Sequence, residues 1–183
     1  MEKIITKRYI LRAPKLNDAE EIYKIWGTDK EGMAEYKEHS IYKNLIETKK
    51  LIEAAIKETE NGVLFWIIEE KESNKIVGYI KIPTASEKDK KCEVAFYFLK
   101  NWRKDGTPEE VLKKVIEYVF NQKCFETIIM KFYAVYVEDT KLLDTILQKI
   151  GMKREGILRH RLINNERQKI DEYIYSILKE EWL

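Results

Sequence analysis

The sequence predicts a single α/β (α+β) domain, built on a mixed, mostly antiparallel central sheet of about seven strands with helices on both faces. Three observations predict this fold class. The chain has 183 residues, close to one domain at roughly 150 residues per domain. Hydrophobic residues make up 44% of it, enough for a core that needs no disulfide or metal. Strand-like and helix-like segments alternate along it, with only seven glycines and three prolines between them.

Seven segments have the alternation or the β-branched content that is typical of strands. They are residues 3–13, 63–70, 75–82, 91–100, 127–137, 152–162 and 167–179. Pro14 ends the first strand, and the polar pair Ser73-Asn74 joins the second and third as a hairpin. Segment 91–100 is apolar on both faces for most of its length, so we expect it to be a buried strand.

Four stretches carry apolar residues at the spacing of an amphipathic helix. These stripes run over residues 19–26, 51–56, 111–120 and 142–150. Gly27 follows the first stripe and Gly151 the last, as is usual at helix ends. Residues 28–45 are expected to be irregular or short helix. The resulting order, β-α-α-β-β-β-α-β-α-β-β, places the helices on both faces of one sheet.

Charge and residue usage exclude several classes of function. Lys and Arg number 34 and Asp and Glu 32, so the net charge of +2 does not favour a nucleic-acid binder. Two distant cysteines and two histidines form no metal-binding pattern, so we expect no metal. The longest apolar run, residues 63–68, is far shorter than a membrane span of about 20 residues. The first residues lack a signal-peptide pattern, so we expect a cytoplasmic protein with no membrane partner.

The segment from Leu99 to Glu110 carries the most specific chemical signal in the sequence. It joins a buried strand to an amphipathic helix, and such a turn directs backbone N–H groups and the positive helix end outward, which suits a phosphate. Charge and a glycine for close approach are supplied by Arg103, Lys104 and Gly106. The run Thr107-Pro108-Glu109-Glu110 also fits a capping box with Thr107 as N-cap, which would explain the turn without any ligand.

Five segments, in order along nearly the whole chain, resemble the motifs of a known family. They are Thr6–Ala13 (TKRYILRA), Cys92–Phe98 (CEVAFYF), Arg103–Pro108 (RKDGTP), Ile150–Gly156 (IGMKREG) and Asp171–Trp182 (DEYIYSILKEEW). They resemble T-x-R-L-x-L-R-P, A-E-I-G-Y-W-L, R/Q-x-x-G-x-G/A, L-G-F-x-x-E-G and D-x-x-x-Y-S-L-L-x-x-E-W in the GNAT superfamily of N-acetyltransferases. The branch that the chain resembles most is that of the ribosomal-protein-alanine N-acetyltransferases.

The resemblance implies one N-acetyltransferase domain over residues 1–183, with acetyl-CoA as co-substrate and no metal. The acetyl group would pass by direct attack, in a ternary complex, to a primary amine of a protein N-terminus or a small molecule. The pyrophosphate of CoA would lie on backbone N–H groups of Arg103, Lys104, Asp105, Gly106 and Thr107. The strand would separate from its neighbour near Leu99, whose N–H would polarise the thioester carbonyl.

An ammonium acceptor must lose a proton before it attacks, so the implied reaction needs a general base. Glu93 matches the glutamate of the family and shares a strand face with Ala95 and Tyr97, so we expect it to be the base. The alternative is an exposed carboxylate that faces lysines. By resemblance, His39 and Asp171 would lie at the acceptor site, although Asp171 suits a structural role equally well.

Four positions depart from the family's pattern. Pro108 removes one N–H donor from the turn, Thr140 and Leu143 replace the Asn and Ser of an N-x-x-S element, and Arg161 stands where some relatives have a catalytic acid. The proton for the thiolate would then come from a tyrosine: Tyr36, Tyr97, Tyr133 or Tyr136. The departures also fit a GNAT-fold protein that binds or senses CoA with little turnover. A protein-interaction domain is a further alternative, and the oligomeric state, monomer or homodimer, stays open.

Overall fold

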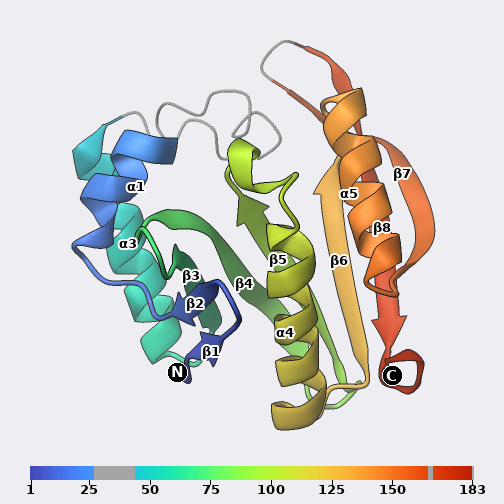
Figure 1. Cartoon of the computed structure of the whole chain (residues 1–183). Coiled ribbons are helices and arrows are strands. Elements are labelled where there is room, and N and C mark those ends of the chain that lie inside the picture. The colour runs from blue at the N-terminus through green and yellow to red at the C-terminus, as the bar shows by residue number, and fades with distance from the viewer. Residues whose placement is uncertain (27–43, 165–166, 183) are drawn as a thin grey trace.

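The computed structural model describes residues 1–26, 44–164 and 167–182, in which one mixed sheet of eight strands is covered by four helices (Figure 1). The strands are β1 (Ile4–Ile5), β2 (Tyr9–Arg12), β3 (Leu64–Glu70), β4 (Ile76–Ser86), β5 (Lys91–Phe98), β6 (Thr127–Tyr133), β7 (Lys153–Ile163) and β8 (Lys169–Leu178). The helices are α1 (Asp18–Trp26), α3 (Leu45–Glu60), α4 (Thr107–Gln122) and α5 (Val137–Lys149).

The strands lie in the order β1-β2-β3-β4-β5-β6-β8-β7, and only β5 and β6 pair in parallel. The expected mixed, mostly antiparallel sheet is therefore confirmed, with one strand more than the seven predicted. The extra strand comes from residues 3–13, which were expected to form a single strand. The chain reverses there because Thr6 Oγ1 accepts a hydrogen bond of 2.9 Å from the N–H of Tyr9. Ile4 and Ile5 consequently pair with Leu11 and Ile10.

Two apolar layers hold the helices on opposite faces of the sheet, as expected. The larger layer lies beneath α4 and α5, and the smaller one beneath α1 and α3. The stripe predicted for α4 is buried in full: Val111, Leu112, Val115, Ile116, Val119 and Phe120. Strand β5 serves both layers, because Val94, Phe96 and Phe98 face the larger layer while Tyr97 faces the smaller one. It is thus the buried strand that its apolar sequence predicts.

The parallel pair β5 and β6 separates halfway along its length, as Figure 1 shows. The two strands pair from Lys91 and Thr127 as far as Val94 and Met130. Strand β5 then continues to Phe98 and β6 to Tyr133 without pairing with each other. The opening lies at the carboxyl ends of neighbouring parallel strands, which is the usual place for a ligand in an open α/β sheet.

Candidate active site

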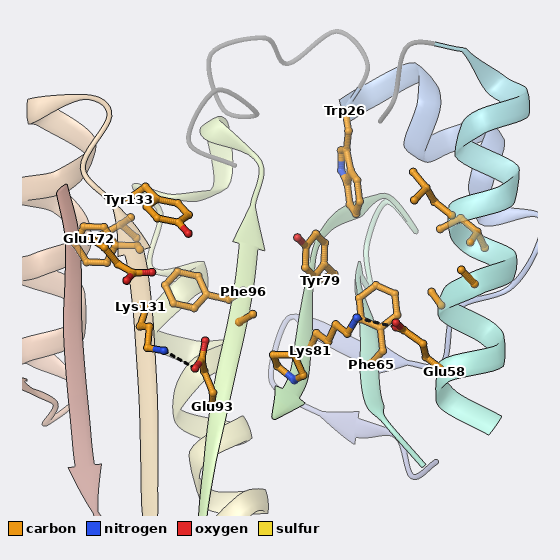
Figure 2. Close-up of a pocket in the computed structure, with 18 residues that line it drawn as sticks. Trp26, Glu58, Phe65, Tyr79, Lys81, Glu93, Phe96, Lys131, Tyr133 and Glu172 are labelled. Carbon is orange, nitrogen blue, oxygen red and sulfur yellow. Dashed lines mark hydrogen bonds and ion pairs between the residues drawn. The ribbon is translucent and has the colours of Figure 1, made fainter. Parts of the chain in front are cut away.

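A cavity of about 510 Å³ lies at the opening between β5 and β6 (Figure 2). One wall carries residues of α1, α3, β3 and β4, and the other carries residues of β5, β6 and β8 together with Leu143 of α5. Its volume lies within the range of roughly 300–1,000 Å³ that is typical of small-molecule sites. The cavity is therefore large enough for a reacting group and part of the molecule that carries it.

The turn that leads from β5 into α4 begins the helix differently from the sequence prediction. The N-cap is Gly106, with a φ of 83°, and not Thr107. The side chain of Asp105 satisfies the first helical N–H, since its Oδ1 accepts a hydrogen bond of 3.0 Å from Thr107 N. Glu110 does not turn back to the cap, because its carboxylate binds the N-terminal segment instead. The predicted capping box is thus wrong, and the helix start is capped by Asp105 instead.

Three of the five backbone N–H groups expected to bind pyrophosphate stay available in this turn. Arg103 N donates to Lys100 O at 3.3 Å and Thr107 N donates to Asp105, so these two donors are used within the protein. Within the described part of the chain, no acceptor is found for the backbone N–H groups of Lys104, Asp105 and Gly106. These three precede the 16-residue helix α4, so the positive end of the helix lies beside them.

The side chain of Arg103 is buried and does not face solvent. It is 3% exposed, and its Nε donates a hydrogen bond of 2.9 Å to the carbonyl of Phe98. Its Nη1 lies 3.5 Å from the carboxylate of Asp139 at the start of α5. Arg103 therefore ties the end of β5 to α5, and the positive side chain that reaches solvent in this turn is that of Lys104.

The N-terminal segment braces the same turn. Arg8 donates from its backbone N at 2.7 Å and from its Nε at 2.8 Å to the Glu110 carboxylate, and its Nη1 lies 3.2 Å from Asp105 Oδ2. Tyr9 and Thr107 share a buried hydroxyl hydrogen bond of 2.6 Å. Burial alone would raise the pKa of Glu110, but hydrogen bonds from Thr6 and Arg8 outweigh it and lower the pKa. Sequence reasoning missed this role, although the opening motif contains Thr6 and Arg8.

The N–H of Leu99 does not face the opening as the resemblance implies. It donates a hydrogen bond of 2.9 Å to the carbonyl of Val77 in β4. Successive N–H groups along a strand point to opposite sides, so the N–H groups of Phe96 and Phe98 are directed toward β6. Both residues follow Val94, where pairing with β6 ends. The N–H of Phe98, and not that of Leu99, is therefore directed toward the opening.

Among the described residues, three carboxylates line the cavity, and each has a cationic partner. Glu93, the expected base, lies 2.6 Å from the Nζ of Lys131 on β6. Glu58 lies 2.7 Å from the Nζ of Lys81 on the opposite wall. Sequence reasoning missed the third carboxylate, Glu172, which is 7% exposed and 3.3 Å from the Nε of Arg161. Arg161, which stands where some relatives have a catalytic acid, thus forms an ion pair with a buried glutamate.

Of the two residues expected at the acceptor site, the structure describes only Asp171, and it lies away from the cavity lining. Asp171 precedes Glu172 on β8, but it does not line the cavity. Its Oδ1 accepts a hydrogen bond of 2.8 Å from the backbone N–H of His160, where β7 adopts a φ of 53°. This contact supports a structural role for Asp171, which was the alternative to a place at the acceptor site. His39 lies outside the described residues.

The structure distinguishes among the candidate tyrosines. Tyr133 lines the cavity, whereas Tyr97 is fully buried beneath α1 and α3, and Tyr136 is 40% exposed just before α5. Tyr36 lies outside the described residues. Burial raises the pKa of Tyr133, and the negative charge of Glu172 raises it further. The hydroxyl of Tyr133 therefore keeps its proton at neutral pH and can donate it.

The described residues contain neither a cluster suited to a metal ion nor a helix suited to a membrane. No group of three or more His, Cys, Asp or Glu side chains is arranged there to hold a metal ion. No helix in these segments combines the length and the apolar character that crossing a bilayer requires.

Comparison with known proteins identifies the family of the chain. The model of the acetyltransferase (GNAT) domain matches residues 8–153. The uncharacterized N-acetyltransferase YoaA of Bacillus subtilis is 26% identical over 176 residues, which are 95% of this chain and 95% of that protein. The structure of the microcin C7 self-immunity acetyltransferase MccE, in complex with acetyl-CoA and AMP, matches with a TM-score of 0.81 at 20% identity over 94% of this chain and 93% of that chain. The ribosomal-protein-S5-alanine acetyltransferase from Vibrio fischeri matches with a TM-score of 0.82 at 15% identity over the whole of both chains. With the family model covering most of its length, the chain belongs to the GNAT family of acetyltransferases.

Proposed function

We propose that the protein transfers an acetyl group from acetyl-CoA to a primary amine at the opening between β5 and β6. The observation that carries this proposal is the separation of the two parallel strands after Val94 and Met130, directly beside the cavity. The opening gives a thioester access to the backbone of β5. The turn before α4 lies at the end of the same strand, so one extended molecule can use both.

The turn suits the pyrophosphate of CoA. The N–H groups of Lys104, Asp105 and Gly106 would donate to its oxygens, and the positive end of α4 and the Lys104 side chain would balance its charge. Gly106 supplies a φ of 83° that other residues rarely adopt. The brace formed by Arg8 neutralises Asp105, which would otherwise repel the phosphates. The residues of this turn therefore fit the pyrophosphate of CoA.

The opening suits the transfer step. Bound acetyl-CoA supplies an acyl group that is activated as a thioester. The N–H of Phe98, directed toward β6, would donate to the thioester carbonyl oxygen in place of the Leu99 N–H. This donor strengthens its interaction as negative charge develops on the oxygen.

Two side chains would handle the protons. Glu93, positioned by Lys131, takes one proton from the ammonium acceptor and later releases it to solvent. The amine nitrogen then bonds to the carbonyl carbon while the carbon–sulfur bond breaks. Tyr133 gives its hydroxyl proton to the departing thiolate and recovers one from the nitrogen. The products are an N-acetyl amine and CoA with a free thiol.

The experiment compares Glu93→Gln with Glu172→Gln, an equally isosteric change in the same cavity. With an amine acceptor at pH 7, we expect Glu93→Gln to lower kcat/KM by about 10²–10⁴, the usual worth of a general base, and to recover as the pH rises. Glu172→Gln should lack this recovery. CoA affinity, measured by calorimetry, should stay unchanged in Glu93→Gln. Saturable CoA binding without transfer to any amine would instead favour a protein that senses CoA.

A further inference from the structure

We propose that the acceptor is a primary amine joined within a few bonds to an aromatic ring, and that this ring binds against an aromatic wall formed by Trp26, Phe65 and Tyr79. The inference rests on the proposed function, because it assigns a substrate class to the same cavity. It is carried by three features of the described lining: the cluster of three rings on one wall, the pairing of the described charges, and the place of Glu93 and Tyr133 on the opposite wall, beside the rings of Phe96 and Phe132.

The aromatic wall is built from three separate elements. Trp26 ends α1, Phe65 lies on β3 and Tyr79 on β4, and Figure 2 shows them together on one side of the cavity. The ring centroids of Trp26 and Tyr79 are 5.5 Å apart and those of Phe65 and Tyr79 are 5.4 Å apart, at tilted and edge-to-face angles. Helix α3 extends this wall with small and aliphatic side chains: Leu51, Ile52, Ala54 and Ala55. Trp26 and Phe65 are almost completely buried, at 2% and 9% exposure, so a guest ring would pack mainly on the half-buried Tyr79, whose orientation these two rings support.

The charges that line the cavity cancel in pairs. Glu58 is paired with Lys81, Glu93 with Lys131, and Glu172 with Arg161, at 2.7, 2.6 and 3.3 Å. Within the described lining no carboxylate is left over to bind a second ammonium group. An acceptor with several amines would therefore lose hydration at its other charges without compensation. The same ion pairs occupy Lys81 and Lys131, so the described lining does not favour an acceptor with an anionic group.

The two walls of the cavity would bind different parts of the acceptor. One wall holds the groups that react with the amine, and the other would bind the aromatic ring. Glu93 and Tyr133 lie on the β5–β6 side, and the aromatic wall lies across the cavity from them (Figure 2). An amine that attacks the thioester carbon at the β5–β6 opening, forming the carbon–nitrogen bond as the carbon–sulfur bond breaks, would extend its substituent toward the rings. A volume of about 510 Å³ accommodates one ring and a short connector on that path.

The test measures binding and transfer separately on the whole chain. In the presence of saturating CoA, calorimetry with 2-phenylethylamine, propylamine and spermidine gives the preference for a ring without requiring turnover. Burial of a ring is expected to favour 2-phenylethylamine over propylamine by on the order of 10- to 100-fold, with spermidine the weakest. Acetylation of the same amines is then followed with acetyl-CoA. The peptides Phe-Ala-Ala and Ala-Ala-Ala distinguish a protein N-terminus from a free amine as the source of the ring.

One variant narrows the cavity without removing any packing. Ala54 is an exposed residue that lines the cavity, so Ala54→Phe should reduce the affinity for 2-phenylethylamine by at least tenfold while CoA affinity is retained. Ile46→Phe is the control, because Ile46 lies on the same helix, is 69% exposed and does not line the cavity. Phe65→Leu should keep the fold and lower the preference for a ring by about threefold to tenfold.

The outcomes separate the inference from the proposed function. Equal binding of 2-phenylethylamine and propylamine, or tighter binding of spermidine, overturns the inference even if an amine is acetylated. Preferential binding of 2-phenylethylamine that Ala54→Phe abolishes, without any acetylation, supports the aromatic wall and overturns the transfer proposal. If none of the amines or peptides binds with CoA present, both fail.

Discussion

Replacing Arg8 by alanine removes three contacts that hold the turn before α4. Its guanidinium reaches Glu110 at 2.8 Å, the Asp105 carboxylate at 3.2 Å and the Asp105 carbonyl at 3.3 Å. The partly buried, charge-assisted bond to Glu110 is worth about 1.5 kcal/mol, and the half-exposed pair with Asp105 about 0.5 kcal/mol. Arg8→Ala should therefore lower the free energy of unfolding by about 2 kcal/mol, or the Tm by roughly 4–8 °C. Without Arg8 the negative charge of Asp105 is no longer neutralised, and its repulsion of the CoA phosphates should weaken CoA binding by about tenfold.

Thermal denaturation and calorimetry with CoA measure the two effects. Lys7→Ala is the matched control, because it removes the same charge from the neighbouring residue, whose exposed side chain makes no hydrogen bond or ion pair with a described residue. If Arg8→Ala melts at the same temperature as Lys7→Ala and binds CoA equally well, then the N-terminal segment does not brace the turn.

The effect of Arg8→Ala on stability should depend on pH. The pKa of Glu110 is lowered from its ordinary value of 4.5 in the folded protein, so its ionised form contributes stability above that value. This contribution is lost as the pH falls through the folded pKa. The difference in unfolding free energy between the wild type and Arg8→Ala should be complete at pH 7 and shrink below about pH 4.5 in urea denaturation. A difference that stays constant down to pH 3 would contradict the assignment.

Three further substitutions or modifications test other parts of the account. Gly106→Val should weaken CoA binding more than it lowers the Tm, because a φ of 83° strains a β-branched residue; normal affinity by calorimetry would remove the turn from the binding site. Gly78→Ala should cost about 2 kcal/mol in urea denaturation, since its Cβ would lie 2.0 Å from the Tyr97 carbonyl oxygen; an unchanged midpoint would refute this close approach. A thiol reagent should modify the exposed Cys124 in the folded protein, and Cys92 only after unfolding, because burial raises the pKa of Cys92 to about 12; two adducts on the folded protein by mass spectrometry would contradict this.

Periodicity was sufficient to predict the fold wherever one face of an element is apolar. The stripe in α4 and the two apolar faces of β5 are read from local spacing alone. The break in residues 3–13 could not be predicted, because it depends on hydrogen bonds between Thr6 and Tyr9 that interrupt an otherwise strand-like pattern. The start of α4 was missed for a related reason. Glu110 binds Thr6 and Arg8, about a hundred positions away, and no local pattern reveals such a contact.

The candidate site could be predicted only in part. The turn at Gly106 and the position of Glu93 were visible in motifs. The choice between Asp171 and Glu172 was not, since both are acidic and adjacent, and the register of β8 against β6 decides which one faces the cavity. The direction of the Leu99 N–H likewise depends on its pairing with Val77 in β4. Each of these requires knowledge of how distant strands align.

The most direct test of the central claim is amine-dependent release of the CoA thiol from acetyl-CoA by the wild-type protein, with mass spectrometry of the amine. The account predicts that thiol release requires the amine, that the product is acetylated on nitrogen, and that Glu93→Gln slows the reaction most at low pH. Thiol release at the same rate without amine, or none with acetyl-CoA bound and every amine and peptide of the panel present, would contradict it.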